Sequence, residues 1–501
     1  MLLTVELTDI ETDEAMLHTD DASVIGIRSQ ERIALTSENS GKLQVIRTTV
    51  SKTAGTKGII YLSRATGKKL NLKAAEIIEV KRAPIPKSVP AIRKKIKGGE
   101  LTAEEIAAVV HESTTGILSG GEISAYLTAV EIRGMTMEET EALTREMVAS
   151  GETIEFDDKP IVDHHSIGGV PGNKVTLLVV PILAAAGLKV PKTCSRAITG
   201  AGGTADLMEA VANVTFSAKE IQEMTEKAGA VIVWGGGVNF APADDVFIVY
   251  ERPLKIDSRS QMIASILAKK KAAGADICIM DIPVGPGTKI QDQKEGRELA
   301  KEFAELGSRL GMKIESAITY GGAPIGRTIG VNLEVAEALR TMEQGITTGS
   351  LAEKSLILAG MGLEMAGKAA EGDGIRMAKE LLQNGKALEK MKDIIEVQGG
   401  NRNVTSADLK PGKFSWDFVS PSDGIVLTVM NRVFVDIARA AGSPADHGAG
   451  IYFHKKPGQH VEKGERLYTI YADNETKLKD AVAIAEEHMT MTVGSMLLGR
   501  A

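Results

Sequence analysis

Small residues, hydroxyls and one arginine are concentrated in a single stretch of the chain. It reads Ser195-Arg196-Ala197-Ile198-Thr199-Gly200-Ala201-Gly202-Gly203-Thr204-Ala205-Asp206. Glycine lets a backbone approach a ligand closely and adopt positive φ, and hydroxyl and N–H groups donate hydrogen bonds. A helix expected from Ala205 to Ala212 would add the positive end of its dipole, and the planar fork of Arg196 matches a phosphate. The stretch predicts an anion-binding loop, with a purely structural turn as the alternative.

Two further glycine-rich segments have the same character. The first, residues 163–174, contributes Ser166, Gly168 and Gly169 and follows a short apolar run. The second follows another apolar run and ends in Lys289, a residue that on its own would be read as a solvated surface lysine. The loop of residues 195–206 and the segment of residues 163–174 are two donor-rich loops in one domain, and together they favour a site that holds two phosphates.

Composition and charge exclude several classes of protein. The chain has 501 residues, of which 43% are hydrophobic and 25% charged, as in a globular protein of several domains. Its formal net charge of −7 argues against a nucleic-acid partner, which needs a basic face. We find no apolar run of about eighteen residues and no secretory signal, so we expect no membrane partner. With only Cys194 and Cys278 we expect no disulfide framework, and these features together predict a cytoplasmic protein.

The first third of the chain changes pattern once. Residues 1–84 alternate short apolar runs with turn residues and predict an N-terminal β-rich domain. Residues 88–154, with parts of 165–190, predict a helical subdomain. Capping boxes that begin at Thr102, Ser119 and Thr136 mark the starts of three of its helices.

The rest of the chain divides into three segments. Residues 155–345 alternate apolar strands with helices and predict an α/β domain that binds phosphate and nucleotide. Residues 346–410 predict a helical connection, and residues 411–501 a C-terminal α+β domain. This last domain resembles the barrel-sandwich modules of biotin and lipoyl carriers, but it has no exposed lysine at a hairpin tip. We therefore expect a structural module, and an α/β multidomain protein as a whole.

Five segments resemble, in order and spacing, the thymidine and pyrimidine nucleoside phosphorylase family. They are residues 161–169, 195–209, 241–244, 257–270 and 280–285. The resemblance covers residues 88–490 and implies the fold of that family, a helical subdomain and a larger α/β domain. The additional N-terminal domain resembles the archaeal branch that acts on nucleoside monophosphates.

The resemblance implies a phosphorolysis in which inorganic phosphate attacks C1′ of the ribose and the base leaves. With AMP the products would be adenine and ribose 1,5-bisphosphate, and CMP and UMP would also be substrates. The resemblance further implies that phosphate is a co-substrate, that no metal or cofactor is required, and that the protein is a homodimer or a higher homo-oligomer.

The resemblance also implies a set of substrate-binding residues. They are Ser166, Gly168, Gly169, Lys174, Ser195, Arg196, Ala197, Ile198, Thr199, Gly200, Thr204, Ser265, Lys269 and Lys289. Ser265 and Lys269 lie four residues apart on one helix face, at positions that contact the base in the family. The family usually has Lys-His-Ser where this chain has His164-His165-Ser166, so a phosphate-binding lysine is absent and Lys174 could supply the charge.

Two residues are candidates for the acid that protonates the departing base. A carboxylic acid whose pKa is raised by burial can protonate N7 of adenine, and Asp257 fits this role. Asp257 could instead cap the helix that follows it. His165 is the second candidate because histidine titrates near neutral pH.

Three other functions remain open at this point. A pyrimidine nucleoside phosphorylase would not need a 5′-phosphate on its substrate. A phosphoribosyltransferase of the anthranilate type would share the fold but would depend on magnesium and phosphoribosyl pyrophosphate. A carrier or assembly protein would bind no nucleotide.

Overall fold

The chain folds into two compact units. The computed structural model describes residues 1–9, 14–37, 43–197 and 200–494. Unit 1 consists of Met1–Ser150 and Pro242–Ala264, and unit 2 consists of Gly151–Ala241 and Ser265–Ala501. The architecture is the mixed α/β multidomain fold that the sequence predicts.

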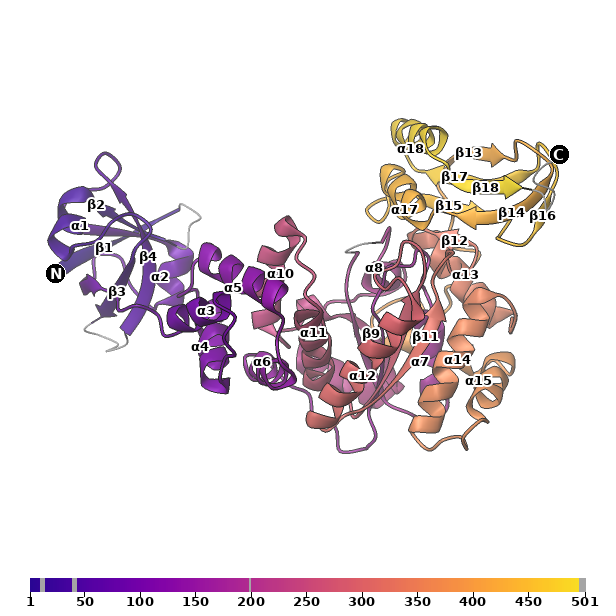
Figure 1. The fold of residues 1–501 in the computed structure, drawn as a ribbon, viewed down its shortest axis with the longest axis horizontal. Helices are drawn as coiled ribbons and strands as arrows, with labels where there is room; N and C mark the ends of the chain where they lie inside the picture. The colour runs from indigo at the N-terminus through magenta and orange to yellow at the C-terminus, as the bar shows by residue number, and fades with distance from the viewer. Residues whose placement is uncertain (10–13, 38–42, 198–199, 495–501) are drawn as a thin grey trace. The chain divides into compact units, whose positions relative to one another are not determined.

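Unit 1 begins with a closed β-barrel, drawn in indigo in Figure 1. Its strands are β1 (Leu2–Thr8), β2 (Ala15–His18), β3 (Arg32–Ser37), β4 (Leu43–Ser51), β5 (Ile59–Ser63) and β6 (Ile77–Arg82), in the order β1-β5-β2-β4-β3-β6. The helices α1 (Thr19–Ile25) and α2 (Arg64–Lys69) connect them. Alternate strand residues such as Leu3 and Val5 face the interior, where each is 1% exposed.

Five helices complete unit 1. They are α3 (Ser88–Ile96), α4 (Ala103–Thr114), α5 (Gly120–Arg133), α6 (Met137–Ala149) and α10 (Pro242–Leu254). The three predicted capping boxes are confirmed, since Thr102, Ser119 and Thr136 each accept a hydrogen bond from the backbone of a glutamate three residues later, and that glutamate bonds back to the cap.

Unit 2 is built on parallel strands. β7 (Val162–Ser166), β10 (Ile277–Val284) and β11 (Lys313–Tyr320) form one sheet, and β8 (Val190–Cys194) pairs in parallel with β9 (Ala230–Trp234). Every residue of β10 is buried, as expected for a strand covered on both faces. The helices are α7 (Thr176–Ala185), α8 (Thr204–Glu209), α9 (Ala218–Ala228), α12 (Gln293–Arg309), α13 (Val331–Glu343), α14 (Ser350–Met365), α15 (Gly374–Gln383), α16 (Lys386–Val397) and the short 3-10 turn Gly235–Gly237. Helix α11 (Arg259–Ala272) begins in unit 1 and ends in unit 2.

The C-terminal part of unit 2 consists of two small sheets and two helices. The strands β12 (Thr328–Ile329), β15 (Gly450–Phe453), β17 (Arg466–Ala472) and β13 (Phe414–Val419) form the first sheet, and β16 (His460–Val461), β14 (Gly424–Val429) and β18 (Met491–Gly494) the second. Helices α17 (Asn431–Ala440) and α18 (Glu475–Glu487) accompany them. The ring of Phe434 lies 4.7 Å from that of Phe453 and 4.9 Å from that of Tyr468, which marks an aromatic core.

The structure differs from the expected segments in three places. Helix α7 belongs to unit 2, although parts of 165–190 were expected in the helical subdomain. Residues 242–264 belong to unit 1, because α10 packs on α5, with Phe247 lying 5.9 Å from the ring of Tyr126. Helix α8 ends at Glu209 and is shorter than the sequence suggested. Among the described helices none is long and apolar enough to cross a bilayer.

The buried ion pair of Glu139 with Lys95 generates a test of the helices of unit 1. Lys95 Nζ lies 2.8 Å from both carboxylate oxygens of Glu139, and the two residues are 3% and 2% exposed. Glu139 also accepts hydrogen bonds from the backbone of Leu101 and Thr136. Glu139→Ala leaves an ammonium buried without its partner, so we expect the opening free energy of α6 to fall by about 3–5 kcal/mol.

Hydrogen exchange of peptides from residues 136–149 measures that change. Glu105→Ala is the matched control, because Glu105 occupies the same capping position in α4 but its ion pair with Lys94 is only half-buried. Glu105→Ala should lower the opening free energy of α4 by less than about 1 kcal/mol. Equal losses in the two helices would contradict the importance of the buried pair.

Candidate active site

Three loops leave the same edge of the parallel strands in unit 2. β7 and β10 pair in parallel, and a parallel bridge between Ile161 and Lys189 joins the segments that lead into β7 and β8. The loops that follow these strands are residues 167–175, 195–203 and 285–292. Open α/β sheets bind ligands outside the carboxyl ends of their strands. The three segments that the sequence marked out therefore lie on the edge where a ligand is expected.

The loops after β7 and β10 lie against each other. Gly169 has a φ of +89°, and a Cβ atom at this position would lie 2.9 Å from the backbone nitrogen of Lys289. Only glycine combines this φ with so close an approach. The hydroxyl of Thr288 fixes the second loop, because it lies 2.8 Å from the carbonyl of Gly285 and 2.5 Å from that of Ile290. Gly169 and Lys289 are thus brought together, as a shared ligand requires.

Asp281 fixes the orientation of Ser166. This fully buried carboxylate accepts hydrogen bonds from the hydroxyls of Ser166 (2.7 Å) and Thr319 (2.6 Å), and the ammonium of Lys354 lies 2.8 Å away. Asn173 donates its side-chain amide to Ser166 Oγ at 2.9 Å. Burial raises the pKa of Asp281, but the Lys354 charge and these hydrogen bonds outweigh it and the net shift is downward. Asp281 therefore stays ionised.

Lys174 does not replace the missing phosphate-binding lysine, and this expectation from the sequence is corrected. Its side chain is fully buried. The ammonium lies 3.0 Å from a carboxylate oxygen of Glu337 and donates to the carbonyls of Ile325 (2.9 Å) and Thr328 (3.1 Å). These partners satisfy all three N–H donors of a lysine. Lys174 instead holds the 325–328 segment against the start of α7.

The two ends of the loop of residues 195–203 are joined through the carboxylate of Asp206, in the helix that follows. Asp206 Oδ2 accepts the N–H groups of Ala197 (2.7 Å) and Gly203 (2.8 Å). Gly203 is required here, because a Cβ atom would lie 2.4 Å from the carbonyl carbon of Arg196. Ser195 is exposed, Thr204 begins α8 at the end of the loop, and the predicted ligands Ile198 and Thr199 lie outside the described residues.

The fork of Arg196 is engaged by carboxylates. Its two terminal nitrogens lie 2.5 and 2.7 Å from the oxygens of Glu209, and one of them lies 3.2 Å from Asp206. The guanidinium also lies 4.9 Å from the ring centroid of Trp234. The hydrogen bond to Glu209 is the main reason that the pKa of Arg196 lies above its ordinary value. In this structure Arg196 braces the loop.

Three buried charges lie behind the loops. Asp163 on β7 is 2.8 Å from the ammonium of Lys270 and 3.4 Å from that of Lys192. Both lysines also donate to the carbonyl of Thr193, at 2.9 and 2.7 Å. Each of the three charged residues is at most 3% exposed. Burial lowers the pKa of Lys192 to about 8, so below that pH the three residues carry a net charge of +1 in a medium of low polarity.

His164 and His165, near the end of β7, are neutral at physiological pH. Burial, followed by the charges of Lys270 and Lys192, holds the pKa of His165 well below its ordinary value. The charge of Lys289 acts in the same direction. Burial likewise lowers the pKa of His164 to about 3. His165 can therefore offer a neutral N–H group, but it holds no surplus proton at neutral pH.

Helix α11 carries the remaining candidates. Ser265 and Lys269 are both partly buried and lie one turn apart, as predicted, in the part of the helix that belongs to unit 2. Asp257 is exposed and lies in unit 1, two residues before the helix begins. The carbonyl of Ser258 accepts the first hydrogen bond of the helix, from the Met262 N–H, at 2.8 Å. Ser258 therefore occupies the capping position, which weakens the interpretation of Asp257 as a helix cap.

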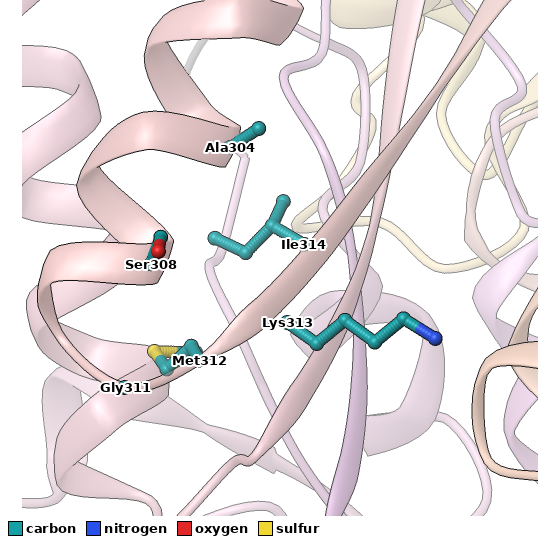
Figure 2. A pocket seen from close by; sticks show the side chains of 6 residues that line it. All are labelled: Ala304, Ser308, Gly311, Met312, Lys313 and Ile314. Carbon is teal, nitrogen blue, oxygen red and sulfur yellow. The ribbon is translucent and has the colours of Figure 1, made fainter.

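Other parts of the structure offer weaker candidates. The hollow in Figure 2 is lined by Ala304, Ser308, Gly311, Met312, Lys313 and Ile314. It lies at the amino end of β11, opposite to the edge from which the three loops leave. Within the described ranges no group of three His, Cys, Asp or Glu side chains is placed to hold a metal ion.

Comparison with known proteins assigns the segments to families. Residues 89–151 match the helical bundle domain of the glycosyl transferase family, and residues 158–388 match its a/b domain. Residues 428–492 match the pyrimidine nucleoside phosphorylase C-terminal domain. Among solved structures, an anthranilate phosphoribosyltransferase from Thermus thermophilus aligns with a TM-score of 0.52 at 22% identity, over 62% of this chain and 99% of its own. That likeness concerns the fold alone.

Curated relatives match the chain from end to end. The AMP phosphorylase of Methanocorpusculum labreanum is 52% identical, over 100% of this chain and 99% of the relative. The AMP phosphorylase of Methanospirillum hungatei is 48% identical, over 100% and 97%. These matches include the N-terminal barrel as well as the segments whose resemblance the sequence analysis described. The chain belongs to the AMP phosphorylase family.

Proposed function

We propose that this protein is a pentosyltransferase that cleaves AMP by phosphorolysis. A phosphate oxygen forms a bond to C1′ of the ribose while the bond from C1′ to N9 of adenine breaks. The electron pair of that bond goes to the base, which takes up a proton. The products are adenine and ribose 1,5-bisphosphate, and inorganic phosphate is the only co-substrate. The observation that carries the proposal is the end-to-end match, at 52% identity, to a relative named AMP phosphorylase.

The three loops supply the anion-binding groups that this reaction needs. In our proposal the loop of residues 195–203, with Thr204, holds the nucleotide, and Lys289 reaches its 5′-phosphate. Ser166, Gly168 and Gly169 hold the attacking phosphate, and Ser265 and Lys269 face the base. The buried net charge of the Asp163, Lys192 and Lys270 cluster favours anions on this edge of the sheet.

Other features of the proposal extend beyond the family match. CMP and UMP are further candidate substrates, and we expect a homo-oligomer that works in the cytoplasm on nucleotide salvage. The two cysteines, which are free thiols, agree with a reducing compartment. Displacement at C1′ needs no organic cofactor or metal ion, so activity should persist in the presence of a chelator.

The first test separates a nucleotide phosphorylase from a nucleoside phosphorylase. If the loops bind a 5′-phosphate, kcat/KM for AMP should exceed that for adenosine by at least about a hundredfold, the scale of two or three charge-assisted hydrogen bonds. Release of free base from AMP, CMP, UMP and their nucleosides, with phosphate present, measures this ratio. Comparable efficiency on adenosine and AMP would argue for the nucleoside enzyme. Activity that requires magnesium and phosphoribosyl pyrophosphate would argue for the phosphoribosyltransferase.

The second test concerns the proton donor. In Asp257→Asn the side chain keeps its shape but cannot act as an acid, so kcat should fall by roughly two to four orders of magnitude while AMP still binds. Because the pKa of His165 is held well below its ordinary value, His165 gains no proton as the pH falls from 8 to 6. The pH profile of kcat should therefore keep its shape in His165→Gln.

Two results would reverse this assignment. Turnover of Asp257→Asn within about threefold of the parent protein would remove Asp257 from the mechanism. A limb of the pH profile near 6.5 that disappears in His165→Gln would return the role of the acid to His165.

A further inference from the structure

Helix α17 of the C-terminal domain, with Ser443 just beyond it, donates hydrogen bonds to the loop of residues 195–203 and to the turn that follows β11. At its end, Arg439 donates from Nε (3.2 Å) and from a terminal nitrogen (3.0 Å) to the carbonyl of Gly200. Just beyond the helix, the hydroxyl of Ser443 donates to the carbonyl of Ala201 at 2.9 Å. At its start, Asn431 donates to the carbonyl of Gly321 at 2.8 Å. Figure 1 places α17 with the C-terminal strands.

The contacts of Arg439 and Ser443 set the direction of two peptide groups. A trans peptide is planar, so its N–H points away from its carbonyl. The carbonyls of Gly200 and Ala201 are both drawn toward the end of α17. The N–H groups that follow them, on Ala201 and Gly202, are therefore directed to the opposite side of the turn. Consecutive N–H groups that point the same way form the kind of concavity that binds an anion.

The other end of the same loop is fixed independently. Asp206 holds the N–H groups of Ala197 and Gly203 where the two arms of the loop meet. Because that carboxylate takes the N–H groups at the base of the loop, the ligand must be bound by donors nearer its tip. Arg439 and Ser443 hold Gly200 and Ala201, described residues of that outer part of the loop.

The start of α17 lies beside the loop that carries Lys289. The carbonyl acceptor of Asn431 belongs to Gly321, where a Cβ atom would lie 2.5 Å from Thr288 Cγ2. Asn431 itself is 4% exposed. A helix of ten residues is about 15 Å long and rigid. The turn at Gly200 and Ala201 and the turn at Gly321, which lies against Thr288, are therefore anchored to opposite ends of one rigid element.

We propose that α17 positions the nucleotide-binding loop, with Arg439 and Ser443 orienting the N–H groups of Ala201 and Gly202 toward the anionic part of AMP. The proposal rests on the proposed function in assigning this loop to the nucleotide. Arg439 and Ser443 are positioning residues, which act through the loop backbone. The C-terminal domain thereby contributes to nucleotide affinity and has little part in the binding of the attacking phosphate.

The test compares AMP with phosphate in the full-length protein. In Arg439→Ala we expect the Kd of AMP, measured by calorimetry, and its KM to rise about tenfold, which corresponds to about 1.4 kcal/mol. The KM of phosphate, kcat and the melting temperature should stay near the parent values. Ser443→Ala should shift the same two constants in the same direction, and Arg439→Lys, which keeps a cationic donor, should recover most of the affinity. Arg432→Ala, on an exposed residue of the same helix, is the matched control.

Two outcomes would overturn the proposal. One is AMP affinity within twofold of the parent in both Arg439→Ala and Ser443→Ala. The other is a parallel loss of AMP affinity, phosphate affinity and thermal stability, which would reveal general support of the fold. Failure of the parent protein to release adenine would contradict the proposed reaction alone. Calorimetry measures AMP binding without turnover, so it would still test the role of α17.

Discussion

The candidate site depends on one buried carboxylate that is shared by two ammonium groups. Asp163 lies on β7, Lys192 on β8 and Lys270 near the end of α11, and both lysines also bond to the carbonyl of Thr193. Removal of one partner from such a cluster leaves a buried charge and costs about 3–5 kcal/mol. The relative placement of two strands and a helix is thereby fixed. Each of these elements leads to, or carries, residues proposed to bind the substrate.

The same cluster gives an acidic protein a place for anions. The chain as a whole has a net charge of −7, which does not favour phosphate binding. Burial and the charge of Asp163 act in opposite directions on Lys270, and the net shift of its pKa is upward, so this lysine stays charged. Burial, and after it the charges of Lys270 and Lys192, hold the pKa of His165 well below its ordinary value, and the same two charges favour a bound phosphate dianion. The charges of the two lysines disfavour a protonated imidazole beside them and favour a bound anion.

Much of the fold could be predicted from the sequence, because the capping boxes, the glycine-rich loops and the apolar strands are local signals. The pairing of Pro242–Ala264 with unit 1 could not, since it depends on contacts such as that of Phe247 with Tyr126. The sequence favours phosphate binding by Lys174, but sequence spacing does not reveal that Lys174 forms a buried ion pair with Glu337. Lys192 and Asp281 did leave a signal, as charged residues inside apolar strands. Such residues are expected to be paired, but the sequence does not identify the partner.

The residues that shape the loops come from segments far apart in the chain. Ser166 is oriented by Asp281, which is held by Thr319 and Lys354, and the turn at Gly200 is held by Arg439. None of these supporting residues needs to touch a ligand, yet a change in any of them would move a donor that does. The geometry of the site therefore depends on contacts between segments that are spread from β7 to α17. A comparison limited to the glycine-rich loops would capture the ligand-facing groups and omit the carboxylates and cations that determine where those groups point.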